Sequence, residues 1–239
     1  ILSVLCTLNS NAQNISAFSD ANRKLYEFNS GRIKMIEFQE VQNLQIGNKY
    51  LAYSDSRGDY FVRWNGIKTK LAQGQTQFFE THNFLVAQHT SILKVVDNGQ
   101  IKNLTSYVNS FGYGDSIIVF QDRIGGNLKY YYQDTIIEFA HVIGDYDLTG
   151  GNIGDNVFAY QDNAGNYYGF SNSNFYKLFS ANQYVKISAG LNLIAYNDPE
   201  TRTFAVFQNG EIQDIENQFV TNFETGRDFV YFFDQSATH

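Results

Sequence analysis

The chain has 239 residues, enough for one large all-β domain or two small ones, and aromatic residues make up 16% of it. Its formal net charge is −7, and no stretch clusters lysine and arginine, which argues against nucleic acid and anionic membrane surfaces as partners. No stretch approaches the ~18 consecutive apolar residues that a membrane-spanning helix needs.

The first twelve residues predict the end of a secretory signal peptide. Ile1–Thr7 is apolar, and small residues follow it up to a cleavage site before Gln13. The alternative is a first β-strand, since short apolar runs are common. We therefore expect residues 1–12 to be leader and residues 13–239 to form the domain, incomplete at its C-terminal end. The protein would then be exported to the periplasm or cell surface. The single cysteine, Cys6, lies in the leader and cannot form an internal disulfide.

A nine-residue signature recurs along the chain. In five places Gly and Asp stand eight positions apart and enclose a strand with an apolar centre: Gly47–Asp55, Gly114–Asp122, Gly154–Asp162, Gly190–Asp198 and Gly226–Asp234. A sixth copy, Ala12–Asp20, has Ala in place of Gly. A seventh, His82–Thr90, has lost both end residues but keeps the apolar centre. Such self-similarity, at about 36 residues per unit, is typical of a repeat architecture.

Alanine returns inside this strand although it is a poor strand former. It occurs at Ala17, Ala52, Ala87, Ala159 and Ala195. The strand is apolar at successive positions, which indicates burial on both faces. We therefore expect steric crowding, as on the innermost strand near a propeller axis.

The Asp that ends each copy predicts a turn rather than a catalytic acid. In three copies it is followed three residues later by Gly, the pattern of a type I turn. We assign this structural role to Asp20, Asp55, Asp122, Asp162, Asp198 and Asp234. A role that returns in every copy is structural, whereas a catalytic group would break the repeat.

Each copy continues with a second strand, a tight turn, a third strand and a poorer fourth segment. The turns include Asn65-Gly66, Asn98-Gly99 and Asn209-Gly210, which are strong hairpin signals because both residues tolerate positive φ. Four antiparallel strands per unit make one blade of a β-propeller. A β-sandwich or an open solenoid is the alternative, but neither explains the fixed internal spacing. We expect six complete units and the start of a seventh, in a propeller of seven blades.

These features resemble the broad class of bacterial envelope β-propellers, over positions 12–239. The composition, rich in Asn, Lys, Ile, Phe and Tyr, is similar to that of exported proteins of the Bacteroidota. Defined propeller families do not fit. The Asp box of sialidases has Asp and Gly two apart rather than three, and Trp64, the single tryptophan, is followed by Asn65 rather than the Asp of WD40 blades. The resemblance implies an architecture and no particular activity.

Candidate chemistry is sparse. No histidine pairs with Cys, His or Glu at a metal-ligand spacing, and the nearest calcium-like pattern is Asp145-Tyr-Asp147. There is no nucleophile elbow and no phosphate loop. We therefore expect no catalytic residue, no metal and no cofactor, with a hydrolase as the less favoured alternative.

The sequence thus predicts a non-enzymatic protein-interaction module of the bacterial envelope, binding a protein partner. An accessory subunit of a secretion translocon, such as the type 9 system, is the concrete form of this hypothesis. The partner could be a membrane protein complex, while the chain itself has no predicted membrane span. A glycan-binding, lectin-like propeller is the alternative. The third unit breaks the repeat, so we expect partner contacts at His82, His89 and Thr90.

Overall fold

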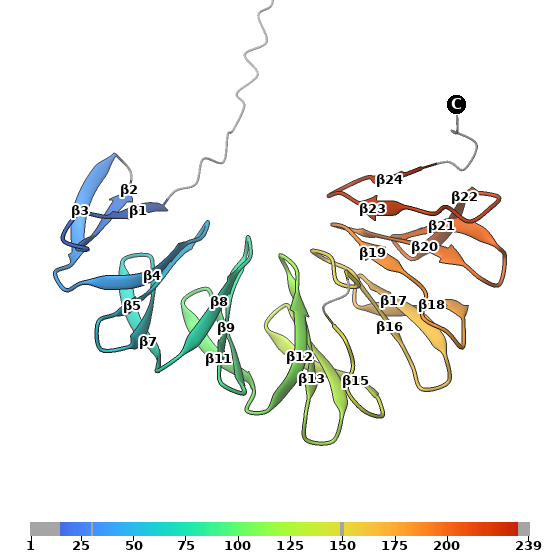
Figure 1. Ribbon diagram of the computed structural model, residues 1–239, viewed down its shortest axis with the longest axis horizontal. Coiled ribbons are helices and arrows are strands. Elements are labelled where there is room, and N and C mark those ends of the chain that lie inside the picture. The colour runs from blue at the N-terminus through green and yellow to red at the C-terminus, as the bar shows by residue number, and fades with distance from the viewer. Residues whose placement is uncertain (1–14, 30, 149–150, 234–239) are drawn as a thin grey trace, which may run out of the picture. The chain divides into compact units, whose positions relative to one another are not determined.

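The computed structural model describes residues 15–29, 31–148 and 151–233 (Figure 1). Twenty-four β-strands lie in these ranges. None of the described residues belongs to a helix that is long and apolar enough to cross a membrane.

The strands form seven antiparallel sheets in which neighbours in sequence are neighbours in the sheet. The first three sheets are β1 (Ile15–Ser19), β2 (Leu25–Asn29) and β3 (Arg32–Glu37); β4 (Val41–Ile46), β5 (Tyr50–Asp55), β6 (Asp59–Trp64) and β7 (Ile67–Gln73); and β8 (Thr76–Glu80), β9 (Phe84–His89), β10 (Ile92–Asp97) and β11 (Gln100–Thr105).

The remaining four sheets follow the same order of strands. They are β12 (Val108–Tyr113), β13 (Ile117–Asp122), β14 (Asn127–Tyr132) and β15 (Thr135–His141); β16 (Phe158–Gln161), β17 (Asn166–Ser171) and β18 (Asn174–Ser180); β19 (Ile187–Ala189), β20 (Leu193–Asp198), β21 (Thr203–Gln208) and β22 (Glu211–Glu216); and β23 (Phe223–Thr225) with β24 (Val230–Phe232).

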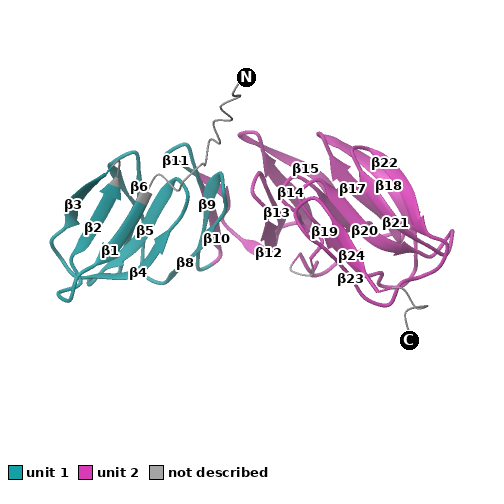
Figure 2. Ribbon diagram, turned by 90° about the horizontal axis from the view of Figure 1, so that it is seen from above, with its two compact units in different colours: residues 1–90, 96–101 teal, residues 91–95, 102–239 magenta. Residues whose placement is uncertain are grey.

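The chain divides into two compact units, which are described separately (Figure 2). Unit 1 comprises residues 1–90 and 96–101, and unit 2 comprises residues 91–95 and 102–239.

The repeated strand occupies a different place in the sheet from the one predicted. In the four-stranded sheets the Gly-to-Asp strand, such as β5, β13 or β20, is the second strand and has a hydrogen-bonded neighbour on each side. The first strand is the fourth segment of the preceding repeat. The prediction that the Gly-to-Asp strand is innermost is therefore wrong. Its alanine is crowded because neighbouring sheets cover both faces, and Ala52 and Ala195 are fully buried.

The third repeat is also shifted by one residue from the predicted alignment. Thr76 pairs with His89 as Val41 pairs with Asp55, so His89 and not Thr90 occupies the Asp position. Thr81 N–H donates to Phe84 O, which is the hydrogen bond that Gly47 makes to Tyr50. The signature of this repeat therefore runs from Thr81 to His89, with Val86 in the alanine position. The sequence concealed this shift because the repeat lacks both end residues.

The tight turns between the second and third strands of each repeat, such as the turn between β6 and β7, have the predicted backbone conformation. Both central residues have positive φ in five of the described turns, as two-residue type I′ hairpins require. They are Asn65-Gly66, Asn98-Gly99, Gln133-Asp134, Asn172-Ser173 and Asn209-Gly210. Gly99 also lies against a neighbouring sheet, because a Cβ there would be 2.4 Å from a ring carbon of Trp64.

The glycine that opens the signature is required by a close approach of backbones rather than by its φ. A Cβ on Gly114 would lie 1.9 Å from Gly154 O, and one on Gly154 would lie 1.8 Å from Gly190 O. The same contact joins Gly190 to Gly226, at 2.3 Å. Successive sheets of unit 2 therefore meet at these turns without room for a side chain.

Backbone hydrogen bonds join the same turns from sheet to sheet. Asp155 N–H donates to Gly190 O at 3.0 Å, and Asn156 N–H donates to Leu191 O at 2.9 Å. Leu191 N–H donates to Arg227 O at 2.7 Å, and Ser116 N–H to Asp155 O at 2.9 Å. Burial, followed by the charge of Asp115, raises the pKa of the Asp155 carboxyl at this junction.

Apolar side chains fill the space between sheets within each unit. In unit 1, Leu25 of the first sheet packs with Leu51 and Tyr53 of the second. In unit 2, Tyr130 packs with Phe158 and Phe170, with ring centroids 5.8 and 4.8 Å apart. Aromatic rings thus supply much of the apolar area buried between blades, at about 25 cal/mol for each Å² removed from water.

The described repeat aspartates lie in the turn that follows the Gly-to-Asp strand, such as the turn between β5 and β6. The carboxylates of Asp20, Asp55 and Asp162 each accept two backbone N–H groups, from the residues two and four positions later. The Asp122 carboxylate accepts from Ile124, and that of Asp198 from Glu200. Asp234 lies outside the described residues. Each described carboxylate thus satisfies backbone donors of its own turn.

The last residue of the Asp turn has positive φ. Its carbonyl oxygen accepts a hydrogen bond from the segment that follows the third strand of the repeat. Gly58 O accepts from Gly74 N–H, and Gly165 O from Ala181 N–H. In the fourth repeat the turn is one residue longer. Gly126, not Gly125, therefore takes this role and accepts from Val142 N–H.

Replacing Gly154 by Ala is expected to lower the free energy of unfolding by about 3 kcal/mol, because the new Cβ would overlap backbone that cannot move away. The matched control is Gly47→Ala at the same repeat position, where the atoms nearest to the Cβ would be those of the flexible Glu80 carboxylate, at 3.2 Å. We expect this control to cost less than about 1 kcal/mol. Urea unfolding followed by circular dichroism measures both, and equal losses would contradict the backbone contact.

Replacing Asp162 by Ala is expected to lower the unfolding free energy by about 1 kcal/mol at neutral pH. Burial opposes ionisation of Asp162, but hydrogen bonds from Asn166 and Ala164 outweigh it and hold its pKa below the ordinary 3.8. A lowered folded-state pKa stabilises the fold above the unfolded pKa, and this contribution is lost as pH falls through the folded value. The difference from wild type should therefore shrink in acid. Asp162→Asn, which keeps the acceptor oxygen, serves as control; a loss unchanged down to pH 2 would refute the role.

Candidate functional site

The third repeat departs from the others at the turn after β9. The four- or five-residue Asp turn is replaced by a short turn at Thr90-Ser91. Thr90 is exposed and has a φ of 54°. A β-branched residue in the left-handed region is strained, and such strain is concentrated at functional positions. This turn is therefore the first candidate for an interaction site.

A polar cavity of about 190 Å³ lies beside this turn in unit 1, lined by Gln75, Gln77, Gln88 and Thr90. Gln77 and Gln88 face each other across the β8–β9 ladder. Because side chains alternate along strands, Gln75 and Thr90 extend the same face by one further pair. Three amides and a hydroxyl thus form one uncharged polar surface, able both to donate and to accept hydrogen bonds.

Gln88 occupies a position that has a structural task in other repeats. There the side-chain amide before the Asp holds the loop leading to the next sheet. Gln121 Nε2 donates to Gly144 O at 2.7 Å, Gln161 Nε2 to Ala181 O at 2.8 Å, and Asn197 Nδ2 to Val220 O at 2.8 Å. Gln88 Nε2 instead donates to Thr90 O of its own turn at 3.1 Å. In the third repeat, the Gln88 amide therefore does not hold the next loop but lines the polar cavity.

The three predicted contact residues are not all brought together. His89 adjoins Thr90, and its Nδ1 lies 3.2 Å from Thr76 Oγ1 and 3.0 Å from Gln75 O. His82 lies at the opposite end of β9, in the β8–β9 turn, with Asn48 Nδ2 3.3 Å from its ring. Sequence reasoning missed the three glutamines because polar residues on a strand face are common and the repeat was misaligned there.

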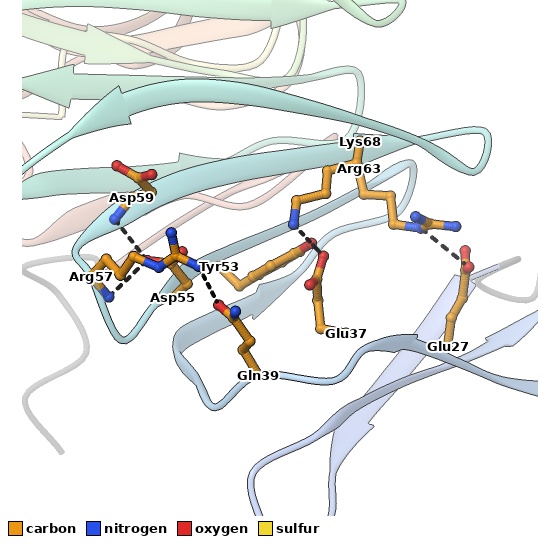
Figure 3. Close-up of polar contacts among 9 residues, drawn as sticks. All are labelled: Glu27, Glu37, Gln39, Tyr53, Asp55, Arg57, Asp59, Arg63 and Lys68. Atoms are coloured by element: carbon orange, nitrogen blue, oxygen red, sulfur yellow. Dashed lines mark hydrogen bonds and ion pairs between the residues drawn. The ribbon is translucent and has the colours of Figure 1, made fainter.

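A second departure from the repeat is a row of charges between the first and second sheets (Figure 3). Glu27 is buried and lies opposite Ala17, a place taken by Val62 and Val206 in the second and sixth sheets. Its carboxylate pairs with Arg63 at 3.4 Å. The charged Glu27 stands at a repeat position that is apolar in the second and sixth sheets, and this is the sequence signal that could have revealed the ion pair.

The same row continues along β3 and β7. Tyr53 Oη donates to Glu37 Oε1 at 2.5 Å, and Lys68 pairs with that carboxylate while lying 3.9 Å from the Phe61 ring centre. Burial, then the bond to Glu37, raises the pKa of the Tyr53 hydroxyl. Negative groups come from the first sheet and positive ones from the second, so this row fixes which two sheets pack together.

The described part of the chain holds no group of three or more His, Cys, Asp and Glu side chains able to bind a metal ion. The calcium-like pattern at Asp145 and Asp147 therefore does not form a group with a third carboxylate or a histidine among the described residues. The polar surface of the third sheet is uncharged and suits hydrogen bonding rather than acid–base chemistry.

A family model for a ten-bladed β-propeller domain matches residues 9–239. Among solved structures, Hsv2 of Kluyveromyces lactis is 11% identical, with 83% of this chain and 72% of that chain covered and a TM-score of 0.42. Human WBSCR16 is 8% identical, covering 93% and 85%, with a TM-score of 0.41. The computationally designed Ika8 protein is 12% identical, covering 92% and 90%, at 0.38. With TM-scores below 0.5 we base no inference on them. No curated protein matches the chain.

The family match confirms the predicted propeller architecture and corrects the predicted blade number. Ten blades, not seven, describe the family. Blade number depends on the angle between successive sheets, which the spacing of a repeat does not reveal. Four of the sheets formed by the described residues have the predicted four strands, and the first, fifth and seventh have fewer. The chain belongs to the family of ten-bladed β-propeller domains.

Proposed function

We propose that the protein is a non-enzymatic interaction module that binds a protein partner through the polar surface of its third sheet. The observation that carries this proposal is the cavity of Gln75, Gln77, Gln88 and Thr90 at the turn that breaks the repeat. The repeated residues, by contrast, are engaged in the scaffold: the described aspartates hold their turns, and the glycines of unit 2 admit backbone contacts.

The chemistry of the surface suits a polypeptide partner. Each glutamine amide offers both a donor and an acceptor, which is what a peptide group requires. An extended segment or loop can therefore satisfy its backbone groups on these side chains. The cavity of about 190 Å³ is smaller than the usual pocket for a small molecule, roughly 300 to 1,000 Å³.

The finer form of the proposal is an exported envelope protein, an accessory subunit of a secretion translocon such as type 9. It is supported by the leader-like residues 1–12 and by the composition. His82, at the far end of β9, belongs to the proposed contact surface only if the partner spans the strand. A lectin with one site in every blade is less well supported, because the described repeat aspartates accept hydrogen bonds from backbone N–H groups of their own turns.

The test compares affinity-tagged full-length chains in envelope fractions of the native cell. The double variant Gln77→Ala/Gln88→Ala should recover about tenfold less of a stoichiometric partner than wild type, because several interfacial hydrogen bonds are lost. His89→Ala and Thr90→Gly should weaken recovery in the same direction. The readout is the amount of partner per tagged chain, by quantitative mass spectrometry.

The matched control is Gln208→Ala, which removes an exposed strand glutamine from the sixth sheet and should leave recovery unchanged. Equal recovery with the double variant would remove the third sheet as the binding surface. The same preparation tests the finer proposal: a partner from a membrane translocon supports it, whereas a chain found in the cytosol contradicts it.

A further inference from the structure

Unit 2 contains a larger polar cavity that is lined by the fourth sheet and the segment that follows it. Its volume is about 500 Å³, and all of its lining residues fall between positions 109 and 145. They come from β12, β13, the β13–β14 turn, the end of β15 and the segment after it, which Figure 1 shows in green and yellow-green. Most of these residues belong to the fourth repeat, in which the sequence interval from the repeat Asp, Asp122, to the next one, Asp162, is the longest in the chain.

The floor of the cavity is a rigid amide network. Gln121 is buried, and its Oε1 accepts from Asn109 Nδ2 at 2.8 Å and from Tyr146 N–H at 2.9 Å. Its Nε2 donates to Gly144 O at 2.7 Å. Asn109 Nδ2 also contacts Asp145 Oδ1 at 2.9 Å, so the Asp145 carboxylate is held at the edge of the cavity. These bonds position the acidic side before any ligand binds.

Two nitrogen-rich side chains, Arg123 and His141, also line the cavity. Arg123 is exposed, and its guanidinium makes no hydrogen bond or ion pair with another described side chain. His141 is exposed, and its Nδ1 lies 3.1 Å from Asn127 Oδ1, a contact that orients the ring. A free guanidinium fork beside an oriented imidazole is suited to a planar carboxylate.

Three glycines, Gly125, Gly126 and Gly144, are also among the lining residues. Gly126 has a φ of 68°, and a Cβ on it would lie 2.6 Å from Val142 O. Gly125 and Gly144 also line the cavity and have φ values of 93° and 85°. The β13–β14 turn therefore comes close to the segment after β15. Because glycine has no side chain, these three residues leave the cavity space open.

We propose that this cavity binds an acidic sugar of the hexuronate class. Arg123 would bind the carboxylate, with His141 beside it, while Asp145 and Asn109 bind hydroxyl groups. A volume of about 500 Å³ lies in the range of small-molecule pockets. The lining is mainly polar, so it favours a hydroxylated ligand over an apolar one. The Asp145 carboxylate disfavours a phosphate dianion more than a uronate, because the dianion carries twice the charge and offers no sugar hydroxyl group that donates to Asp145.

This inference goes beyond the proposed function and is independent of it. It rests on residues of the fourth sheet and the segment after it, whereas the protein-binding surface lies at β8 and β9. A single site in one repeat also differs from a lectin that repeats its binding groups in every blade.

The test is a titration of the ¹⁵N-labelled full chain with glucuronate and with galacturonate, followed by NMR. At least one of the two should shift the amide signals of Arg123, Gly125, Gly126 and His141. The neutral sugar methyl glucoside should bind about tenfold more weakly, because the charge-assisted bond to Arg123 is absent. Inorganic phosphate should bind no better than the neutral sugar.

Arg123→Gln should weaken uronate binding about tenfold, because the charge-assisted bond to the ligand carboxylate is lost. The control is Arg202→Gln, an exposed arginine in the corresponding turn of the sixth repeat, which should leave binding unchanged. The absence of binding by either uronate overturns the proposal. Equal binding of the neutral sugar or of phosphate, or an equal loss with Arg202→Gln, also overturns it.

Discussion

In unit 2 the backbones of successive sheets touch at the glycine that opens each repeat, and the rest of that unit depends on this contact. Gly154 lies so close to Gly190 O that a Cβ would be 1.8 Å away. Backbone bonds such as that from Asp155 N–H to Gly190 O fix the spacing at the same point. Since the turns are joined, the aromatic side chains behind them must fill a gap of set width. This accounts for the return of both small and aromatic residues at constant positions.

Because the repeated side chains already make hydrogen bonds within the scaffold, binding sites are expected at positions that depart from the repeat. A carboxylate such as Asp162 that accepts two N–H groups of its own turn has little capacity left for a ligand. An amide such as Gln161 that holds the next loop is equally committed. Side chains become available where a repeat changes length, as at Thr90 in the third repeat and at Arg123 in the fourth. The two proposed surfaces lie at these irregular positions.

Much of this fold could be predicted from the sequence, because the repeat displays local rules directly. The Asn98-Gly99 pair required positive φ, and the apolar centre of β5 required burial on both faces. The assignment of strands to sheets was harder to predict. Whether the fourth segment of a repeat pairs with the strand before it or with the Gly-to-Asp strand after it depends on tertiary packing. The register of His89 was hidden by the loss of the end residues. Glu27 and Arg63 lie 36 positions apart, and no local pattern joins them. The cavities depend on loop paths, which no spacing reveals.

Amide hydrogen exchange tests the central contact most directly. The account predicts that the N–H groups of Asp155, Asn156 and Leu191 exchange at least about a hundredfold more slowly than that of Asn48, because their turns donate to the next sheet. Asn48 belongs to the equivalent turn of the second sheet, where the atoms nearest to a Cβ on Gly47 would be those of the Glu80 side chain and not backbone of the next sheet. Exchange of all four amides at similar rates would contradict a continuous backbone contact between the sheets of unit 2.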